Sequence, residues 1–203
     1  MHPSTHAPLL KFQPSTSAPL SVATTEWPRT TDKRDFTMKR LYLIRHAKSS
    51  WNNADLADYE RPLNKRGEKD TPFMGKRLKK HDVKPDLIIS SPAKRALKTA
   101  KIIAQEIGYP TKKIYTNESI YDAAPLSLLN TIRNIDDLYD QVMLFGHNSI
   151  TELARYFTKY QVENVPTCGI FCIGFDLDSW EAVSEGKGDF IFFDYPKKHQ
   201  KSS

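Results

Sequence analysis

The sequence predicts an α/β domain with three layers, in which helices cover both faces of a mostly parallel central sheet. From Met38 onward, short apolar runs alternate with stretches of helical periodicity, which is the order of elements in strand–helix–strand units. The apolar runs are continuous rather than alternating, and this indicates strands that are buried on both faces and pair in parallel. A chain of 203 residues suits one such domain.

The predicted elements follow one another in strand–helix order along the chain. Strands are expected at 41–44, 87–89, 114–115 and 142–145, and helices at 65–81, 92–107, 125–133 and 149–160. Pro72 leaves the start of the first helix open, since a helix could also begin there with Asp70 or Thr71 as its cap. Residues 170–176 and 189–195 are predicted to form a C-terminal strand pair at the sheet edge, joined through residues 185–188.

Residues 1–37 differ in composition from the rest of the chain. They are rich in Ser, Thr and Pro, carry only Glu26, Asp32 and Asp35 as acids, and show neither strand nor helix periodicity. We therefore expect a disordered N-terminal extension over 1–37 and a single catalytic domain over 38–203.

Charge and cysteine usage narrow the class of protein. The formal charge of +6 suits an anionic partner, but it does not distinguish nucleic acid, acidic lipid and phosphorylated metabolites or proteins. No apolar run approaches the roughly 18 residues that span a bilayer, so no membrane association is expected. Cys168 and Cys172 are predicted to share one strand face as reduced core residues of a cytoplasmic protein. A contribution to a zinc site is the alternative, and no further Cys or His pair completes it.

Polar residues follow three of the buried strands, at the edge of an α/β sheet where ligands bind. The three segments are Arg45-His46-Ala47-Lys48-Ser49-Ser50-Trp51-Asn52, Ser90-Ser91-Pro92-Ala93-Lys94-Arg95 and Gly146-His147-Asn148. Together they bring two arginines, two histidines and an asparagine to one crevice. This set matches what a phosphoryl group with three equatorial oxygens requires.

Arg95 is notable for its predicted place in a helix. Ser91 has the character of an N-cap and Pro92 that of the first helical residue, so Arg95 would lie in the first turn. A cation there faces the positive end of the helix dipole, at a cost of about 0.3 to 1 kcal/mol that a bound anion would reverse.

His46 could be a structural residue, a metal ligand or a nucleophile. A metal would prefer carboxylates or further histidines and few arginines nearby, so the basic surroundings argue against a metal site. A nucleophilic imidazole must present one unprotonated nitrogen to phosphorus while a hydrogen bond, most simply to a backbone carbonyl, fixes the other.

The sequence resembles the histidine phosphatase superfamily (branch 1), and within it the short SixA-type phosphohistidine phosphatases. Four ordered motifs carry this resemblance, which spans residues 38–196: Leu43-Ile44-Arg45-His46-Ala47, Arg61-Pro62-Leu63-Asn64-Lys65-Arg66-Gly67, Ser90 through Ala100 with Arg95, and Gly146-His147-Asn148. The resemblance implies a phosphoglycerate-mutase-like fold and a hydrolase that needs no metal or other cofactor.

The resemblance also implies roles for individual residues. His46 would be phosphorylated during turnover, Arg45 and Arg95 would clamp the phosphoryl oxygens, and His147 would hydrogen-bond the same group. Asn52, which follows a tryptophan as in many relatives, would add a donor. The proton donor is less well matched, because the family's glutamate has Asp122 as its nearest counterpart and Glu118 as a second candidate.

These features predict a two-step phosphatase that releases inorganic phosphate from a phosphohistidine protein. A protonated phosphoramidate needs little help from an acid, and the sequence lacks room for a helical subdomain that would cover the pocket. A phosphatase or mutase acting on small phosphoesters such as sugar phosphates is the first alternative. A non-catalytic phosphate-binding adaptor is the second. Lysines at 76–80 and 197–198 are interpreted as a solvated helix face and a polar tail, so no nucleic-acid partner is expected.

Overall fold

The computed structural model describes residues 38–52 and 55–200. The extension predicted at 1–37 lies outside the described residues. The described part of the chain contains no helix that is long and apolar enough to cross a bilayer.

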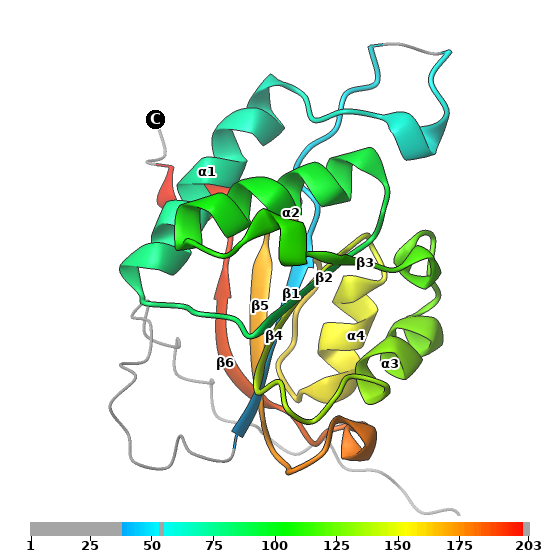
Figure 1. Cartoon of the computed structure of the whole chain (residues 1–203), viewed down its shortest axis with the longest axis vertical. Helices are drawn as coiled ribbons and strands as arrows, with labels where there is room; N and C mark the ends of the chain where they lie inside the picture. Colours follow the sequence, from blue (N-terminus) through cyan, green and yellow to red (C-terminus); the bar gives the residue numbers. More distant parts are fainter. Residues whose placement is uncertain (1–37, 53–54, 201–203) are drawn as a thin grey trace, which may run out of the picture.

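A six-stranded sheet with the strand order β3-β2-β4-β1-β5-β6 forms the centre of the molecule (Figure 1). Its strands are β1 (Met38–Arg45), β2 (Leu87–Ser90), β3 (Tyr115–Thr116), β4 (Gln141–Gly146), β5 (Ile170–Asp176) and β6 (Asp189–Asp194). The first four strands pair in parallel, whereas β5 is antiparallel to both β1 and β6. The predicted, mostly parallel sheet with a C-terminal strand pair is therefore confirmed.

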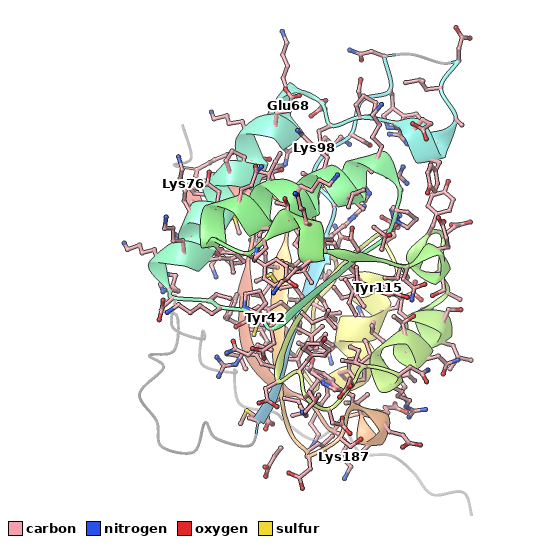
Figure 2. All side chains as sticks on the ribbon, in the orientation of Figure 1. Tyr42, Glu68, Lys76, Lys98, Tyr115 and Lys187 are labelled. Atoms are coloured by element: carbon pink, nitrogen blue, oxygen red, sulfur yellow. The ribbon has the colours of Figure 1, made fainter. Side chains whose placement is uncertain are left out.

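Two pairs of helices complete the three layers (Figure 1). The helices are α1 (Lys65–Lys80), α2 (Lys94–Ile107), α3 (Pro125–Arg133) and α4 (Ile150–Phe157). Successive β1 side chains enter opposite layers: Tyr42 packs with residues of α1 and α2, and Leu43 with residues of α3 and α4. On the outer side of α1 and α2, Lys76 and Lys98 point away from the sheet (Figure 2), as expected of a solvated face.

Helix α1 begins at Lys65, which decides the boundary that the sequence left open. The side chain of Asn64 caps it, since Oδ1 accepts a hydrogen bond of 2.9 Å from the backbone N–H of Gly67. Pro72 lies inside the helix. The cap also brings the chain close to the loop after β1, because the Asn64 N–H donates to the Lys48 carbonyl at 3.0 Å.

Several predicted boundaries differ from the observed ones by one to three residues; the first strand, for example, begins at Met38 rather than at 41. Helix α2 begins at Lys94 rather than at 92, and the backbone of Ala93 at its N-cap is extended (φ −50°, ψ 132°). Helix α4 ends at Phe157 rather than at 160, because Thr158 is extended and its hydroxyl donates to the Ala154 carbonyl at 2.9 Å. The third strand is shifted by one residue to Tyr115–Thr116.

The two cysteines are free and buried, as predicted, but they do not share a strand face. Cys168 precedes β5 in a left-handed conformation (φ 62°), and Cys172 lies inside the strand. The Cys168 N–H donates to the carbonyls of both Arg45 and His46, at 3.0 and 3.1 Å. This bend therefore ties the end of β1 to the start of β5.

Candidate active site

The candidate site lies where β1, β4 and β2 end. These three strands are neighbours and run in parallel, so their carboxyl ends meet at one edge of the sheet. Arg45 is the last residue of β1, His147 follows β4, and Arg95 lies in the first turn of α2. All three line one cavity of about 830 Å³, together with His46. The structure thus brings together the four residues that the strand endings pointed to.

The imidazole of His46 is held in one tautomer. Its Nδ1 lies 2.8 Å from the Ala47 carbonyl oxygen, which can only accept, so Nδ1 carries the proton and Nε2 is unprotonated, with an electron pair that accepts a long hydrogen bond of 3.4 Å from Nε of Arg95. Only 8% of the residue is exposed. Burial lowers the pKa of His46 to about 3; the bond to Ala47 raises it, and the charges of His147, Arg95 and Arg45 lower it further. His46 is therefore neutral at physiological pH.

The guanidinium of Arg95 lies between the two histidines and a carboxylate. Its Nε is 3.4 Å from Nε2 of His46, and its Nη2 is 3.3 Å from Nδ1 of His147. On the opposite edge, Nη1 donates to the backbone carbonyl of Asp58 at 2.5 Å, and Nη2 donates to the Asp58 carboxylate at 2.8 Å. One edge of the Arg95 guanidinium therefore faces the two histidines of the cavity, while the other edge is hydrogen-bonded to Asp58.

Among the described residues, the guanidinium of Arg45 is anchored through one nitrogen. Its Nη1 donates to the side-chain oxygen of Asn164 at 3.1 Å and to the Val165 carbonyl at 2.8 Å. Its Nε is buried and has no hydrogen-bond partner among the described residues. A buried unpaired donor costs about 1–3 kcal/mol, and an anion in the cavity would remove that cost. Burial also lowers the pKa of Arg45.

His147 is oriented from the α2 side of the cavity. Its Nε2 lies 2.9 Å from the hydroxyl of Ser91, and its ring centre is 5.1 Å from that of His46. Burial and the charge of Arg95 lower the pKa of His147 to about 4, although Asp58 and Asp122 raise it. The same hydroxyl accepts a hydrogen bond of 3.3 Å from the Ala93 N–H, but Ser91 does not cap α2, because the helix begins only at Lys94.

The three remaining candidates, Asp122, Glu118 and Asn52, take different positions. Asp122 lines the cavity from a left-handed turn (φ 50°). Glu118 does not line it and instead accepts a hydrogen bond of 3.3 Å from the hydroxyl of Tyr59. Asn52 is exposed and does not line the cavity; its backbone N–H donates to the Ser50 hydroxyl at 3.1 Å. Of these three, only Asp122 reaches the site.

Sequence reasoning missed Asp58 and Arg61. Asp58 belongs to the short helix η1 (Asp58–Glu60), and its carboxylate accepts from Nη1 of Arg61 at 2.7 Å. Arg61 was noted only as part of a motif, yet it is buried and lines the cavity, with the exposed ring of Trp51 over its guanidinium. The spacing of three residues between a carboxylate and an arginine was the available signal.

Metal donors do not gather at this site. Within residues 38–52 and 55–200, no group of three His, Cys, Asp or Glu side chains is placed to hold a metal ion. Three guanidinium groups and two imidazoles line the cavity instead, a set suited to a tetrahedral oxyanion. Three carboxylates line it as well.

Comparisons with known proteins agree with this chemistry. The sequence model of the histidine phosphatase superfamily (branch 1) matches residues 41–118. An uncharacterized chloroplastic protein of Arabidopsis thaliana is 32% identical over 151 residues, which cover 70% of this chain and 69% of that protein. A phosphoglycerate mutase of Schizosaccharomyces pombe is 35% identical over 82 residues, 39% of each chain.

Solved structures share the fold at low sequence identity. The protein histidine phosphatase SixA complexed with tungstate superposes with a TM-score of 0.68 at 17% identity, covering 79% of this chain and 99% of that one. A mycobacterial glucosyl-3-phosphoglycerate phosphatase in complex with VO3 has a TM-score of 0.58 at 13% identity, covering 77% and 99%. The fold is therefore phosphoglycerate-mutase-like.

Proposed function

Because this chain belongs to the histidine phosphatase superfamily (branch 1) and is a phosphatase, we propose that it hydrolyses phosphohistidine on a protein substrate through a phosphorylated His46. The observation that carries this proposal is the fixed tautomer of His46. Its Nε2 is unprotonated, buried, and 3.4 Å from the guanidinium of Arg95.

In the first step, Nε2 of His46 attacks phosphorus in line. A bond forms between Nε2 and phosphorus while the bond from phosphorus to the leaving nitrogen breaks, and the leaving imidazole keeps the proton that it already carries. Arg95 and Arg45 stabilise the charge on the equatorial oxygens, with His147 as a third contact. Asn52 has no part in this step, since it lies outside the cavity lining.

In the second step, water attacks the phosphorus of phosphohistidine-46. The bond to Nε2 breaks, His46 returns to its neutral form, and inorganic phosphate leaves. Asp122 is the carboxylate of the cavity that we assign to accept the proton of that water. Fixed arginines supply the positive charge that Mg²⁺ supplies in nucleotide-dependent phosphoryl transfer, so we propose that neither step needs a metal ion.

Carboxylates lie among the cations of the cavity, and these carboxylates favour a phosphoramidate over an acidic metabolite. Asp122 and Glu152 line the cavity in addition to Asp58. Carboxylates attract the protonated imidazole of a phosphohistidine and repel the carboxylate of a phosphoglycerate.

A cytoplasmic location stays a prediction from the sequence.

A phosphatase or mutase for small phosphoesters is the second candidate. The observation that favours it is the similarity to the S. pombe phosphoglycerate mutase. Steady-state comparison of a phosphohistidine protein with several sugar phosphates separates the two, and a higher kcat/KM for the sugars would overturn our choice.

The test of the mechanism is intact-mass spectrometry during turnover of a phosphoramidate, with alkaline quenching and EDTA present throughout. We expect a transient gain of one phosphate that is lost on acid treatment and absent from His46→Ala. Near-normal turnover by His46→Ala would refute the mechanism. Tight binding of a phosphoprotein without turnover would point to the adaptor.

A further inference from the structure

We propose that Asp58 is a positioning residue, which holds one edge of Arg95 so that the other edge faces the two histidines. The inference rests on the proposed function only in taking Arg95 to bind the phosphoryl group. Asp58 touches neither histidine directly and would act through the guanidinium.

The geometry separates the two edges of Arg95. Nη1 and Nη2 donate to the Asp58 carbonyl and carboxylate at 2.5 and 2.8 Å. Nε and the other hydrogen of Nη2 point toward His46 and His147, at 3.4 and 3.3 Å. Asp58 therefore does not occupy the donors that face the cavity. It fixes the plane of the guanidinium from behind, as a bidentate pair does.

Asp58 is itself held in place. Its carboxylate accepts hydrogen bonds from Nη1 of Arg61 at 2.7 Å and from the hydroxyl of Tyr121 at 3.1 Å. Arg61 in turn donates to the Ser49 hydroxyl at 2.7 Å and to the Ser50 carbonyl at 3.0 Å, in the loop that follows His46. A series of contacts therefore runs from His46 through Arg95, Asp58 and Arg61 back to the loop that follows His46.

The other arginine of the site is anchored in a similar way. Arg45 is tied to Asn164 and Val165 through Nη1, while its Nε is left without a partner among the described residues. Each guanidinium is therefore fixed to the protein by some of its N–H groups. Arg45 leaves Nε without a partner among the described residues, and Arg95 directs Nε and one hydrogen of Nη2 at the two histidines of the cavity. A guanidinium on a flexible stem binds an oxyanion better when its orientation is fixed beforehand.

Two other roles for Asp58 make different predictions. If its carboxylate competed with phosphate for Arg95, removing it would raise activity. If it were the proton donor, removing it would harm substrates with poor leaving groups far more than substrates with good ones. The pKa of Asp58 lies below its usual value, because bonds from Arg61 and Arg95 outweigh the effect of burial, so the carboxylate is ionised rather than ready to donate.

The experiment is a double-mutant cycle of Asp58→Ala and Arg95→Ala, measured with p-nitrophenyl phosphate and with a phosphoramidate. We expect Asp58→Ala to lower kcat/KM by about 10- to 100-fold on both substrates, as loss of a charged hydrogen bond would. In the Arg95→Ala background, the same change should cost less than about twofold. Glu60→Ala is the matched control, since Glu60 lies on the same short helix and only approaches Lys94, at 4.0 Å.

Three results would overturn the proposal. The effects in the cycle could be additive, Asp58→Ala could have unchanged or increased activity, or its loss of activity could be confined to the substrate with the poorer leaving group. Asp58→Asn keeps the shape of the side chain and one acceptor oxygen, so it serves if the alanine variant does not fold, and it should lose less activity; the backbone carbonyl that accepts from Nη1 of Arg95 is present in both variants. If the wild type formed no phosphoenzyme, the proposed function would fail on its own. Tungstate binding by calorimetry across the same cycle would then test the positioning role separately.

Discussion

Lowering the pH from 8 to 5 should leave His46 uncharged in the folded protein. Burial and nearby cations hold its pKa at about 3, against about 6.5 in an unfolded chain. Protonating the ring inside the fold would therefore cost about 5 kcal/mol, at 1.36 kcal/mol per pH unit. Because the unfolded chain takes up a proton below pH 6.5 and the folded protein does so only near pH 3, stability falls as the pH falls through this window. By pH 5, His46 alone should cost about 2 kcal/mol of stability.

Two measurements check this expectation. In an NMR titration, the imidazole signals of His46, assigned with a His46→Asn variant, should not move between pH 8 and pH 5. They should also report a proton on Nδ1 throughout. In urea unfolding, the wild type should lose about 2 kcal/mol more than His46→Asn between the same two pH values. Titration of His46 near pH 6.5, or equal pH dependence of the two proteins, would refute the reasoning.

Three further predictions concern the site and the core. Arg95→Ala should lower kcat for p-nitrophenyl phosphate by about 10²- to 10³-fold with an unchanged circular dichroism spectrum; a loss below about fivefold would contradict its assigned role. Gly67→Ala should destabilise the protein by about 1–3 kcal/mol in urea unfolding, because a Cβ there would lie 2.2 Å from the Lys48 carbonyl oxygen; unchanged stability would mean that the contact can relax. Cys168 and Cys172 should resist thiol reagents until urea is added, because burial raises the pKa of Cys168 to about 12 and that of Cys172 further still; rapid labelling of the native protein would count against this burial.

The sequence was most informative where function and local structure share the same residues. Arg45 ends a buried strand, and His46 and His147 directly follow one, so the pattern that identified the strands also located these side chains. Parallel pairing then placed the strand ends at one edge. A short apolar run and the polar residues that follow it are adjacent in the sequence, so both can be recognised from a single sequence.

Side-chain direction was less predictable. Asn52 follows Trp51 in a segment without regular structure, and nothing in its spacing indicates that it points away from the cavity. Ser91 has the character of a helix cap, but α2 begins only at Lys94, and the Ser91 hydroxyl also contacts His147, which lies 56 residues further along the chain. A contact with so distant a partner cannot be recognised from the local sequence.

The sequence by itself determined the order of elements, the mostly parallel sheet, the family and the cluster of arginines and histidines at one sheet edge. It did so because hydrophobic periodicity and motif spacing are written along the chain. The tertiary structure decided the tautomer of His46, the clamp of Asp58 on Arg95 and the Nε of Arg45, which is buried without a partner among the described residues. The tautomer depends on a backbone conformation that brings the ring to the carbonyl of the next residue, and the other two features depend on burial and on contacts between segments far apart in sequence.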